Sequence, residues 1–574
     1  MDGPGFGCRI DNTKAGIMKK KFEIEKPIFI PGALILIAII LYGYLFNDSF
    51  NKIMTVAYYY VTDFAGWFMM LVSALLVILV FVLCLTPLGK QKVGGPDAKI
   101  KHSMFTWVAM VTCSGTATAV VFYAVGEPIS YFHNPPAWWG MEGGTMNTAV
   151  RALSQSVFHW GFTYYAMYAF WGLIAGYAVM NLKLPYRPSS ALYPVLRDRA
   201  FGTAGRVFDV ISLLALVGGL VTSLGLGVQQ FASGLDYVFG IKPSNMVFVI
   251  TLILVIASYT LSSGRGVKKG MAIISNINMY IYMFVIVFLY VVGDTVFEFK
   301  IMTQTLGEVI TMFIPNITAA DSFNVGNGWI ANNTVFFVAW IMAYAPMVGL
   351  FQGKVAVGYT WRRFLLVNIL APGFFVLVWF VAFGGNAIHL DAFQGANLGN
   401  EIAEKGVPIA NFALLNYLPL KQVMVPLVVG ALFFGFITIA DAMTGTLASM
   451  TTKNCREDEA PVPMKCFWGI LLGFDTFLCL FCLGTTGTTS LQFMSVVFGL
   501  PIFVYTCVTL RGLGWMCSGK LAREFASLKP EQREALSEGK PIGDKAWAEA
   551  EEEEEIESDE NDKLIAAKTF GKSR

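Results

Sequence analysis

Residues 104–126 read MFTWVAMVTCSGTATAVVFYAVG, an uncharged run long enough to cross a lipid bilayer. The hydrocarbon core is about 30 Å thick, and about 20 apolar helical residues span it. The middle of the run, 113–119 (CSGTATA), carries only small and hydroxyl-bearing side chains. A helix is weak there, because glycine costs backbone entropy and hydroxyls compete for backbone hydrogen bonds. The pattern therefore predicts a membrane-spanning helix that is interrupted near its midpoint.

Apolar runs of similar length recur through most of the chain, in which 55% of the residues are hydrophobic and 14% are charged. Soluble domains carry roughly 25% charged residues. The segment 301–322 is half polar, which favours a helix that lies along the membrane surface. We predict an all-α integral membrane protein with twelve transmembrane helices, near 28–46, 66–88, 104–126, 152–180, 208–236, 246–263, 271–293, 333–353, 363–385, 423–450, 464–485 and 490–511.

The distribution of basic residues predicts the orientation. Short loops rich in lysine and arginine stay on the cytoplasmic side, and here these residues gather in alternate loops, at 90–101, 183–206, 265–269, 354–363 and 453–465. We therefore expect a cell-membrane protein with both termini in the cytoplasm, a short N-terminal segment at 1–27 and an acidic tail at 513–574. The polar, basic start around Lys19 lacks the pattern of a cleavable signal peptide. The basic residues form no stripe that would indicate nucleic-acid binding.

A second weak point lies in the eighth predicted span, at 339–346 (AWIMAYAP), and is followed by Gly349. Pro346 cannot donate a backbone hydrogen bond and clashes with the preceding helical turn. The two weak points are five spans apart, and interrupted helices at matching positions of two repeats indicate a transporter site. Close helix packing through small residues is the alternative interpretation.

Aromatic residues crowd the fourth predicted span at 158–168 (FHWGFTYYAMY). Trp160, Tyr164 and Tyr168 recur every four residues and share one helix face, with Tyr165 beside them. Aromatic faces around one point can hold a trimethylammonium group, because its diffuse charge is attracted by the ring quadrupoles. The alternatives are a stripe that only packs and a belt at the membrane interface.

Enzymatic and metal-binding sites have little support. The nine cysteines lie mostly in apolar runs, where a thiol acts as a small apolar side chain. Cys479 and Cys482 have CxxC spacing without a second pair, so they predict no metal site. Of the four histidines only His159 falls within a predicted span, and we expect a structural role for it. We expect no enzyme and no cofactor beyond a possible coupling ion, and the absence of a filter loop disfavours a channel.

Several motifs, in order along the chain from about 28 to 512, resemble the betaine/carnitine/choline transporter family. They are FYAVGEP at 122–128, FHWG at 158–161 with Tyr165 and Tyr168, Leu184-Pro185, Ser189-Ser190 and Pro194, TSLGLG at 222–227, Ser263-Gly264, Lys268-Lys269-Gly270 with Ser275 and Asn278, Trp340 with Pro346 and Gly349, Thr438 with Asp441, and GLP at 499–501. The resemblance implies the LeuT-type fold of five-plus-five inverted repeats that the family shares with amino-acid/sodium symporters. The repeats would be 104–300 and 333–512, joined by 301–332, with 28–103 as two extra helices. The family is typically trimeric, so a homotrimer in contact with membrane lipids is expected.

The resemblance also implies a secondary transporter that moves a betaine-like zwitterion or quaternary ammonium solute, such as glycine betaine, choline or carnitine, by alternating access. Carried over by position, the substrate-binding residues are Trp160, Tyr165, Tyr168, Trp340, Ile341 and Tyr344, with the backbone at Gly115, Thr116, Ala117 and Thr118. The family usually has tryptophan where this chain has Tyr165 and Ile341, so the cage is weaker by one ring. A different polar osmolyte, such as a sulfonium compound, ectoine or taurine, is therefore the alternative substrate.

The residues leave the coupling ion open. Sodium symporters of the family hold sodium between the third and tenth helices, with two successive hydroxyl residues on the tenth. Here Thr438 is followed by Ile439, and the further candidates for an ion site are Thr116, Thr222 and Ser223. Sodium coupling, proton coupling and substrate exchange are the alternatives, and a transporter-derived sensor is a further one.

Overall fold

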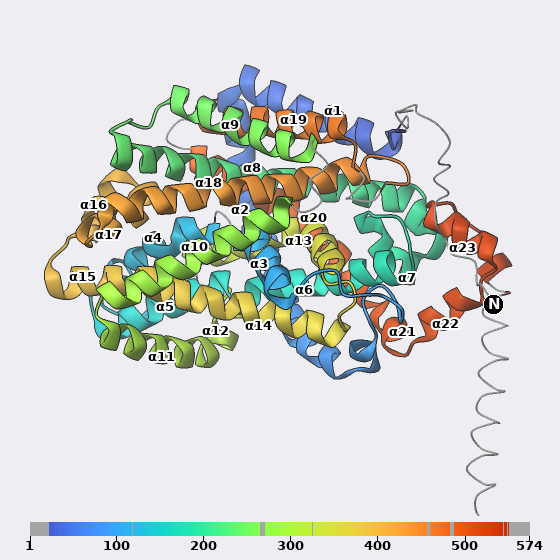
Figure 1. The fold of residues 1–574 in the computed structure, drawn as a ribbon, viewed down its shortest axis with the longest axis horizontal. Helices are drawn as coiled ribbons and strands as arrows, with labels where there is room; N and C mark the ends of the chain where they lie inside the picture. The colour runs from blue at the N-terminus through green and yellow to red at the C-terminus, as the bar shows by residue number, and fades with distance from the viewer. Residues whose placement is uncertain are drawn as a thin grey trace, which may run out of the picture.

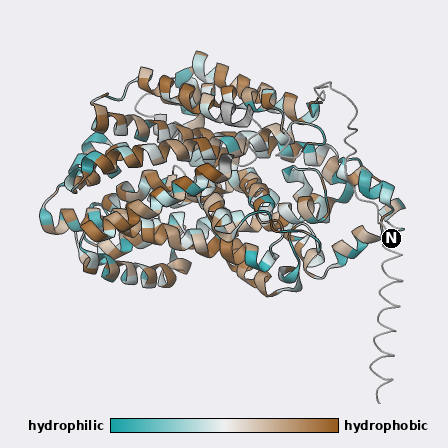
Figure 2. Cartoon of the chain, viewed as in Figure 1, coloured by the Kyte–Doolittle hydropathy of each residue, from teal (hydrophilic) through white to brown (hydrophobic). Residues whose placement is uncertain are grey.

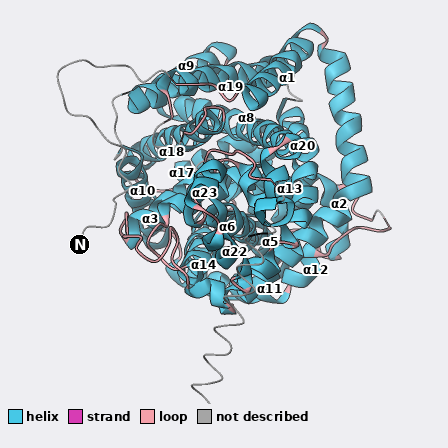
Figure 3. Cartoon of the chain, turned by 90° about the vertical axis from the view of Figure 1, so that its right-hand side faces the viewer, coloured by secondary structure: helices cyan, strands magenta, loops and turns pink. Residues whose placement is uncertain are grey.

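The computed structural model describes residues 22–549, apart from 117–118, 265–269, 324, 456–459, 483–486, 544 and 548. The segment 1–21 and the end of the acidic tail, 550–574, therefore lie outside the described residues. Within them the chain is helical, and extended backbone pairs only in two isolated bridges, Ile24 with Thr452 and Lys92 with Thr360. Figure 3, turned to look along the bundle, shows the helices packed side by side. The described chain is thus an all-helical bundle.

The long helices in chain order are α1 (Lys26–Leu45), α2 (Asn47–Leu85), α3 (Met104–Thr116), α4 (Ala119–His133), α5 (Met146–Trp160), α6 (Phe162–Gly176), α8 (Thr203–Phe239), α9 (Asn245–Gly264), α10 (Gly270–Val292), α11 (Thr295–Thr311), α13 (Phe336–Val355), α14 (Trp361–Phe380), α18 (Lys421–Met450), α19 (Val462–Cys482) and α20 (Gly487–Leu510). Shorter helices are α7 (Tyr193–Leu196), α12 (Phe313–Ile317), α15 (Asn386–Gln394), α16 (Leu398–Lys405), α17 (Ala410–Tyr417), α21 (Leu513–Cys517), α22 (Lys520–Ser527) and α23 (Pro530–Ser537). Wider π-type turns, η3 (Tyr177–Asn181), η6 (Ala331–Val335) and η7 (Val381–Gly385), extend α6, precede α13 and follow α14.

Nine helices of the described part are long and apolar enough to cross a membrane: α1, α2, α8, α10, α13, α14 continued into α15, α18, α19 and α20. The pair α3–α4 adds a tenth, bent by 63° between Gly115 and Ala119. The runs predicted at 152–180 and 246–263 also contain helices. However, α5 and α6 have 15 residues each, and the apolar part of α9, Asn245–Ser258, is similarly short. The chain is therefore a multi-pass membrane protein, and the count of twelve spans stays a prediction.

Hydropathy changes along the helices as expected for a membrane protein. In Figure 2 hydrophobic residues fill the middle of the bundle, and hydrophilic ones are most frequent toward its left and right ends. Helix α2 lies at the periphery of the bundle (Figure 3), and its large apolar side chains Phe64 and Trp67 are 67% and 58% exposed. An apolar surface of this extent is unfavourable in water, so it indicates contact with lipid.

Helix α13 lies in the middle of the bundle and packs against α6, α8 and α20 (Figure 1). The interruption expected at Pro346 is absent, because α13 runs unbroken from Phe336 to Val355. A Cβ added at Gly349 would lie 2.6 Å from the backbone nitrogen of Gly172 on α6, so the two backbones touch. This contact packs α13 tightly against α6 close to Pro346. The segment therefore fits the alternative interpretation, in which its small residues serve close helix packing.

The fourth predicted span contains a break that the sequence analysis did not anticipate. Helix α5 ends at Trp160 and α6 begins at Phe162, with Gly161 between them. A Cβ at Gly161 would lie 2.6 Å from the carbonyl oxygen of Val157, so only glycine fits this turn. The chain thus changes direction immediately after Trp160, which sets the position of that indole.

Candidate functional site

A small closed cavity lies where the bent pair α3–α4 meets α5, α6, α8, α13 and α18. Its volume is about 10 Å³, roughly the space of one water molecule. The lining residues are Ser114, Gly115, Ala119, Trp160, Tyr164, Tyr168, Ser223, Trp340, Ile341, Tyr344 and Ile439. Residues from both predicted repeats therefore meet at one point inside the bundle.

The aromatic rings of the cavity contact one another edge to face. The Trp160 and Trp340 ring centroids are 5.8 Å apart at 88°, and those of Tyr164 and Tyr168 are 4.8 Å apart at 67°. Trp160 and Tyr168 are almost fully buried, which is typical of rings that meet protein rather than lipid. Edge-to-face packing of this kind holds the rings in fixed orientations around the cavity.

Hydroxyl groups form the polar part of the cavity wall. Tyr168 donates to the Tyr164 hydroxyl at 3.1 Å, and Tyr164 donates to the Gly115 carbonyl oxygen at 2.6 Å. The hydroxyls of Ser223 and Tyr344 lie 2.7 Å apart. Among the described residues, the lining includes no charged side chain. A ligand of this cavity is therefore held by ring faces, hydroxyls and backbone.

Several residues that the sequence places in the site have other partners. The Tyr165 hydroxyl lies 3.4 Å from the Thr112 carbonyl oxygen, and Tyr165 does not line the cavity. The side chain of Thr116 and the whole of Ala117 and Thr118 lie outside the described residues. Of the described residues next to this interruption, Gly115 on one side and Ala119 on the other line the cavity.

The candidate ion ligands have separate partners. Ser223 faces the cavity, whereas the Thr222 hydroxyl donates to the Gly218 carbonyl and lies 2.8 Å from the Ser495 hydroxyl. The Thr438 hydroxyl donates to the Phe434 carbonyl of its own helix, and its neighbour Ile439 lines the cavity. These contacts leave the coupling ion an open prediction.

The site residues carried over from the family did not include four lining residues, Tyr164, Ser114, Ala119 and Ile439. The signal for Tyr164 was present, because it stands midway between Trp160 and Tyr168 in the four-residue spacing. Sequence reasoning also missed Glu127, a glutamate of the apolar helix α4. Glu127 is only 4% exposed. An ionisable side chain within a span is costly, so it is a functional candidate by default.

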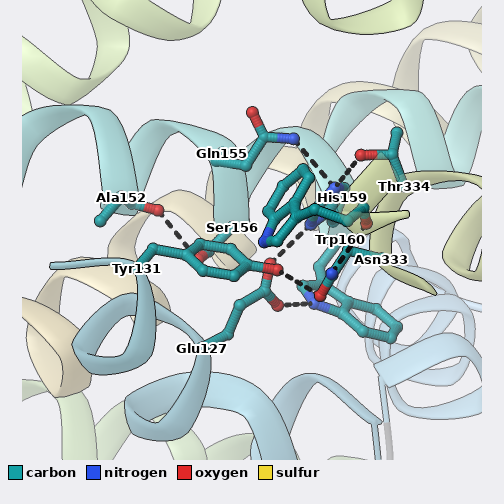
Figure 4. Close-up of polar contacts among 10 residues, drawn as sticks. Glu127, Tyr131, Ala152, Gln155, Ser156, His159, Trp160, Asn333 and Thr334 are labelled. Carbon is teal, nitrogen blue, oxygen red and sulfur yellow. Dashed lines mark hydrogen bonds and ion pairs between the residues drawn. The ribbon is translucent and has the colours of Figure 1, made fainter. Parts of the chain in front are cut away.

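Glu127 connects the cavity wall to a buried polar network (Figure 4). One carboxylate oxygen accepts a hydrogen bond from Trp160 Nε1 at 2.6 Å, and the other lies 2.5 Å from His159 Nδ1. His159 Nε2 in turn lies 2.9 Å from Gln155 Nε2 and 3.1 Å from Thr334 Oγ1. The network thus joins α4 and α5 to the π-type turn that precedes α13.

A much larger cavity, of about 760 Å³, lies at the ends of α6, α13 and α18. Basic residues of the predicted cytoplasmic loops dominate its charge: Lys101, Lys183, Arg187, Arg206, Lys354 and Lys453. Glu23 and Glu25 of the N-terminal segment and Glu538 of the tail line it as well. Described residues near both ends of the chain therefore line the same cavity.

Comparison of the sequence with known proteins identifies one family. The sequence model described as "BCCT, betaine/carnitine/choline family transporter" matches residues 27–518, which run from α1 through α21. A probable glycine betaine transporter of Desulfitobacterium hafniense is 30% identical over 493 residues, covering 86% of this chain and 97% of the relative.

Relatives with other named substrates are equally similar. An osmo-dependent choline transporter of Acinetobacter baylyi is 30% identical over 497 residues, covering 86% of this chain and 71% of the relative. An ectoine/hydroxyectoine transporter of Virgibacillus pantothenticus is 28% identical over 498 residues, covering 87% and 97%. Since the family match spans nearly the whole membrane part, this chain belongs to the betaine/carnitine/choline transporter family.

Proposed function

We propose that this chain is a secondary active transporter for a betaine-like solute, a zwitterion or cation with a quaternary ammonium head such as glycine betaine, choline or carnitine. The observation that carries the proposal is the closed cavity lined by Trp160, Tyr164, Tyr168, Trp340 and Tyr344. One cation–π contact is worth about 0.5–2 kcal/mol. Several such contacts offset the loss of hydration of a head group that makes no hydrogen bonds of its own.

The bent α3–α4 pair can bind the end of such a solute that is opposite its ammonium head, a carboxylate or an alcohol. Ala119, the first residue of α4, lines the cavity. Free backbone N–H groups at a helix N-terminus attract a carboxylate. The hydroxyls of Ser223 and Tyr344 can donate to a carboxylate or bond to an alcohol. Betaine, carnitine and choline therefore all fit the chemistry of the wall.

The size of the cavity supports alternating access. A volume of about 10 Å³ is far below the 300–1,000 Å³ of ordinary ligand pockets, so the rings must separate before a solute enters. We propose twelve spans in a five-plus-five inverted repeat, 104–300 and 333–512, with 28–103 as extra helices and 301–332 as the connection. Rocking of one repeat bundle against the other would open the cavity to each side in turn.

The large basic cavity supports the proposed orientation. Cytoplasmic loops are enriched in lysine and arginine, and this cavity collects such residues together with parts of both chain ends. We propose that it is the cytoplasmic mouth, that both termini are cytoplasmic, and that the protein lies in the cell membrane as a homotrimer. Chemical crosslinking of native membranes tests the trimer.

A different polar osmolyte is the second candidate substrate. Ile341 and Ile439 replace rings or polar groups in the wall, which leaves fewer aromatic faces for a quaternary head. Sulfonium compounds, ectoine and taurine carry smaller or more polar groups, and the ectoine/hydroxyectoine transporter is among the relatives.

Uptake by the purified protein in lipid vesicles tests the function. We expect labelled glycine betaine or choline to accumulate with saturable kinetics, and unlabelled solutes that share the site to compete. Carnitine, proline betaine, a sulfonium analogue, ectoine and taurine complete the panel. Neither binding nor uptake of any of them would reject the proposal, and current without saturation would indicate a channel.

A further inference from the structure

We propose that Glu127 is a positioning residue for Trp160, and that its negative charge makes the cavity discriminate a charged trimethylammonium head from an uncharged head of the same shape. The role rests on the proposed function, because it concerns the ring that would meet the solute. It assigns a selectivity determinant to a side chain that does not itself line the cavity.

The geometry of the Trp160 indole supports this role. Its Nε1–H points at the Glu127 carboxylate at 2.6 Å, Tyr123 stacks on the ring with centroids 5.2 Å apart, and Phe337 packs against its edge. Hydrogen bonds to a charged acceptor are roughly twice as strong as neutral ones. The carboxylate therefore fixes the indole in one plane, directly after the turn at Gly161.

The two carboxylate oxygens of Glu127 face different partners. One accepts the Trp160 Nε1–H, and the other lies 2.5 Å from His159 Nδ1. Among the described residues no lysine or arginine lies within ion-pair distance of Glu127, so no permanently charged side chain pairs with it.

Burial makes this charge effective. The side chains of Glu127 and His159 are 2% and 0% exposed, and electrostatic interactions are stronger in a medium of low effective dielectric constant than in water. A carboxylate that accepts the indole N–H pushes electron density onto the ring, and cation–π attraction depends on the negative potential of the ring face. Both effects favour a positive head group and are indifferent to a neutral one.

Matched solutes separate charge from shape. The head group of glycine betaine or choline is compared with the tert-butyl analogue of the same solute, which has nearly the same volume and no positive charge. Dissociation constants for each pair are measured by tryptophan fluorescence or calorimetry on the purified full chain. The selectivity ratio is the Kd of the neutral analogue divided by the Kd of the charged solute.

We expect Glu127→Gln to lower this ratio by about threefold or more, since roughly 0.7 kcal/mol of cation–π attraction corresponds to that factor. Glutamine keeps the volume and one acceptor oxygen, so packing alone predicts no change in the ratio. Equal weakening of both solutes, or no weakening of either, would overturn the role of the charge. A wild-type protein that binds no charged solute would instead count against the proposed function.

Glu298→Gln, on α11 and outside the cavity lining, is the control for replacing a buried glutamate. Glu298 keeps its proton at neutral pH, so this variant changes the side chain without removing a charge. Its selectivity ratio is expected to equal that of the wild type. If Glu127→Gln does not fold, Trp160→Phe decides, because it removes the N–H donor and leaves the carboxylate. An unchanged ratio in Trp160→Phe would overturn the inference. Where both single variants fold, we also measure the double variant. Its selectivity ratio should be no lower than that of the more affected single variant, because Glu127 acts through Trp160.

Discussion

At the scale of single residues, Trp160 and Tyr168 allow binding to be separated from folding. We expect Trp160→Ala and Tyr168→Ala each to weaken binding of glycine betaine or choline about tenfold or more, because each removes a ring whose contact with a cation is worth about 0.5–2 kcal/mol. Titration followed by fluorescence or calorimetry measures the change. Tyr165→Phe is the control, since Tyr165 lies outside the cavity lining. Unchanged affinity in both alanine variants would mean that these rings only pack.

Part of this site could be predicted from residue spacing, and part could not. The four-residue spacing on α5 and α6 indicated a shared aromatic face, although the turn at Gly161 displaces Trp160 from the helix that carries Tyr164 and Tyr168. Tyr165 is adjacent in sequence but outside the cavity, because one residue changes the direction of a helical side chain by about 100°. Glu127 carried the general signal of an ionisable residue in an apolar helix, but its contact with Trp160 could not be predicted, since it depends on which helix packs behind Trp160.

A second residue-scale prediction concerns Glu298, whose carboxylate is fully buried on α11 without a hydrogen-bond partner among the described residues. Burial, with a smaller contribution from the nearby Asp294, raises the pKa of Glu298 from 4.5 to about 9. The folded state keeps the proton over this window while the unfolded state releases it. The stabilising contribution is therefore complete below pH 4.5 and is lost as the pH rises through about 9.

The measurement is the melting temperature of the purified protein as a function of pH. We expect that of the wild type to fall between about pH 5 and pH 9, and Glu298→Gln to show a flatter profile because glutamine does not titrate. Identical slopes in the two proteins would show that Glu298 does not control this pH dependence.

At the scale of elements, hydropathy located the membrane segments better than it described their interiors. The twelve apolar runs all contain helices, but α2 begins at Asn47, well before the predicted start at 66. Asp48, Lys52 and Asp63 hid this extension, because charged residues lower hydropathy without preventing a helix. Pro346 suggested an interruption, but α13 is unbroken there and packs closely against α6. Gly161 interrupts the fourth predicted span, which composition alone did not indicate.

The contact between α6 and α13 gives an element-scale prediction. We expect Gly349→Ala to destabilise the protein by about 1–3 kcal/mol, since the added methyl group would meet the backbone of Gly172 at 2.6 Å. Thermal unfolding in detergent measures the change. Gly430→Ala on α18 is the control: no atom lies within 4 Å of its added Cβ, so it should leave stability unchanged or raise it by about 0.5–1 kcal/mol. Equal melting temperatures for the two variants would contradict the close contact.

At the scale of the whole molecule, two features set the conditions for transport. The cavity between the bent α3–α4 pair and α13 has a volume of only about 10 Å³, whereas the basic cavity at the ends of α6, α13 and α18 has about 760 Å³. A solute can therefore pass only if the helices around the cavity move. In the proposed secondary transport, the free energy for uphill movement would come from a second solute, and residues next to the cavity are where the two solutes would influence each other.

We expect Thr438 to couple binding of the transported solute to binding of the second solute. Its hydroxyl donates to Phe434, which leaves the oxygen lone pairs able to meet a hard cation, and its neighbour Ile439 lines the cavity. We expect an inward sodium gradient to drive accumulation in vesicles, and Thr438→Val to lose this drive while still exchanging labelled for unlabelled solute. Thr446→Val is the matched control, because Thr446 also bonds to the carbonyl four residues earlier on α18. If a proton gradient drives accumulation in the wild type, or if the wild type only exchanges solute, sodium is not the coupling ion. If both variants lose the sodium-driven accumulation equally, Thr438 has no special part in coupling.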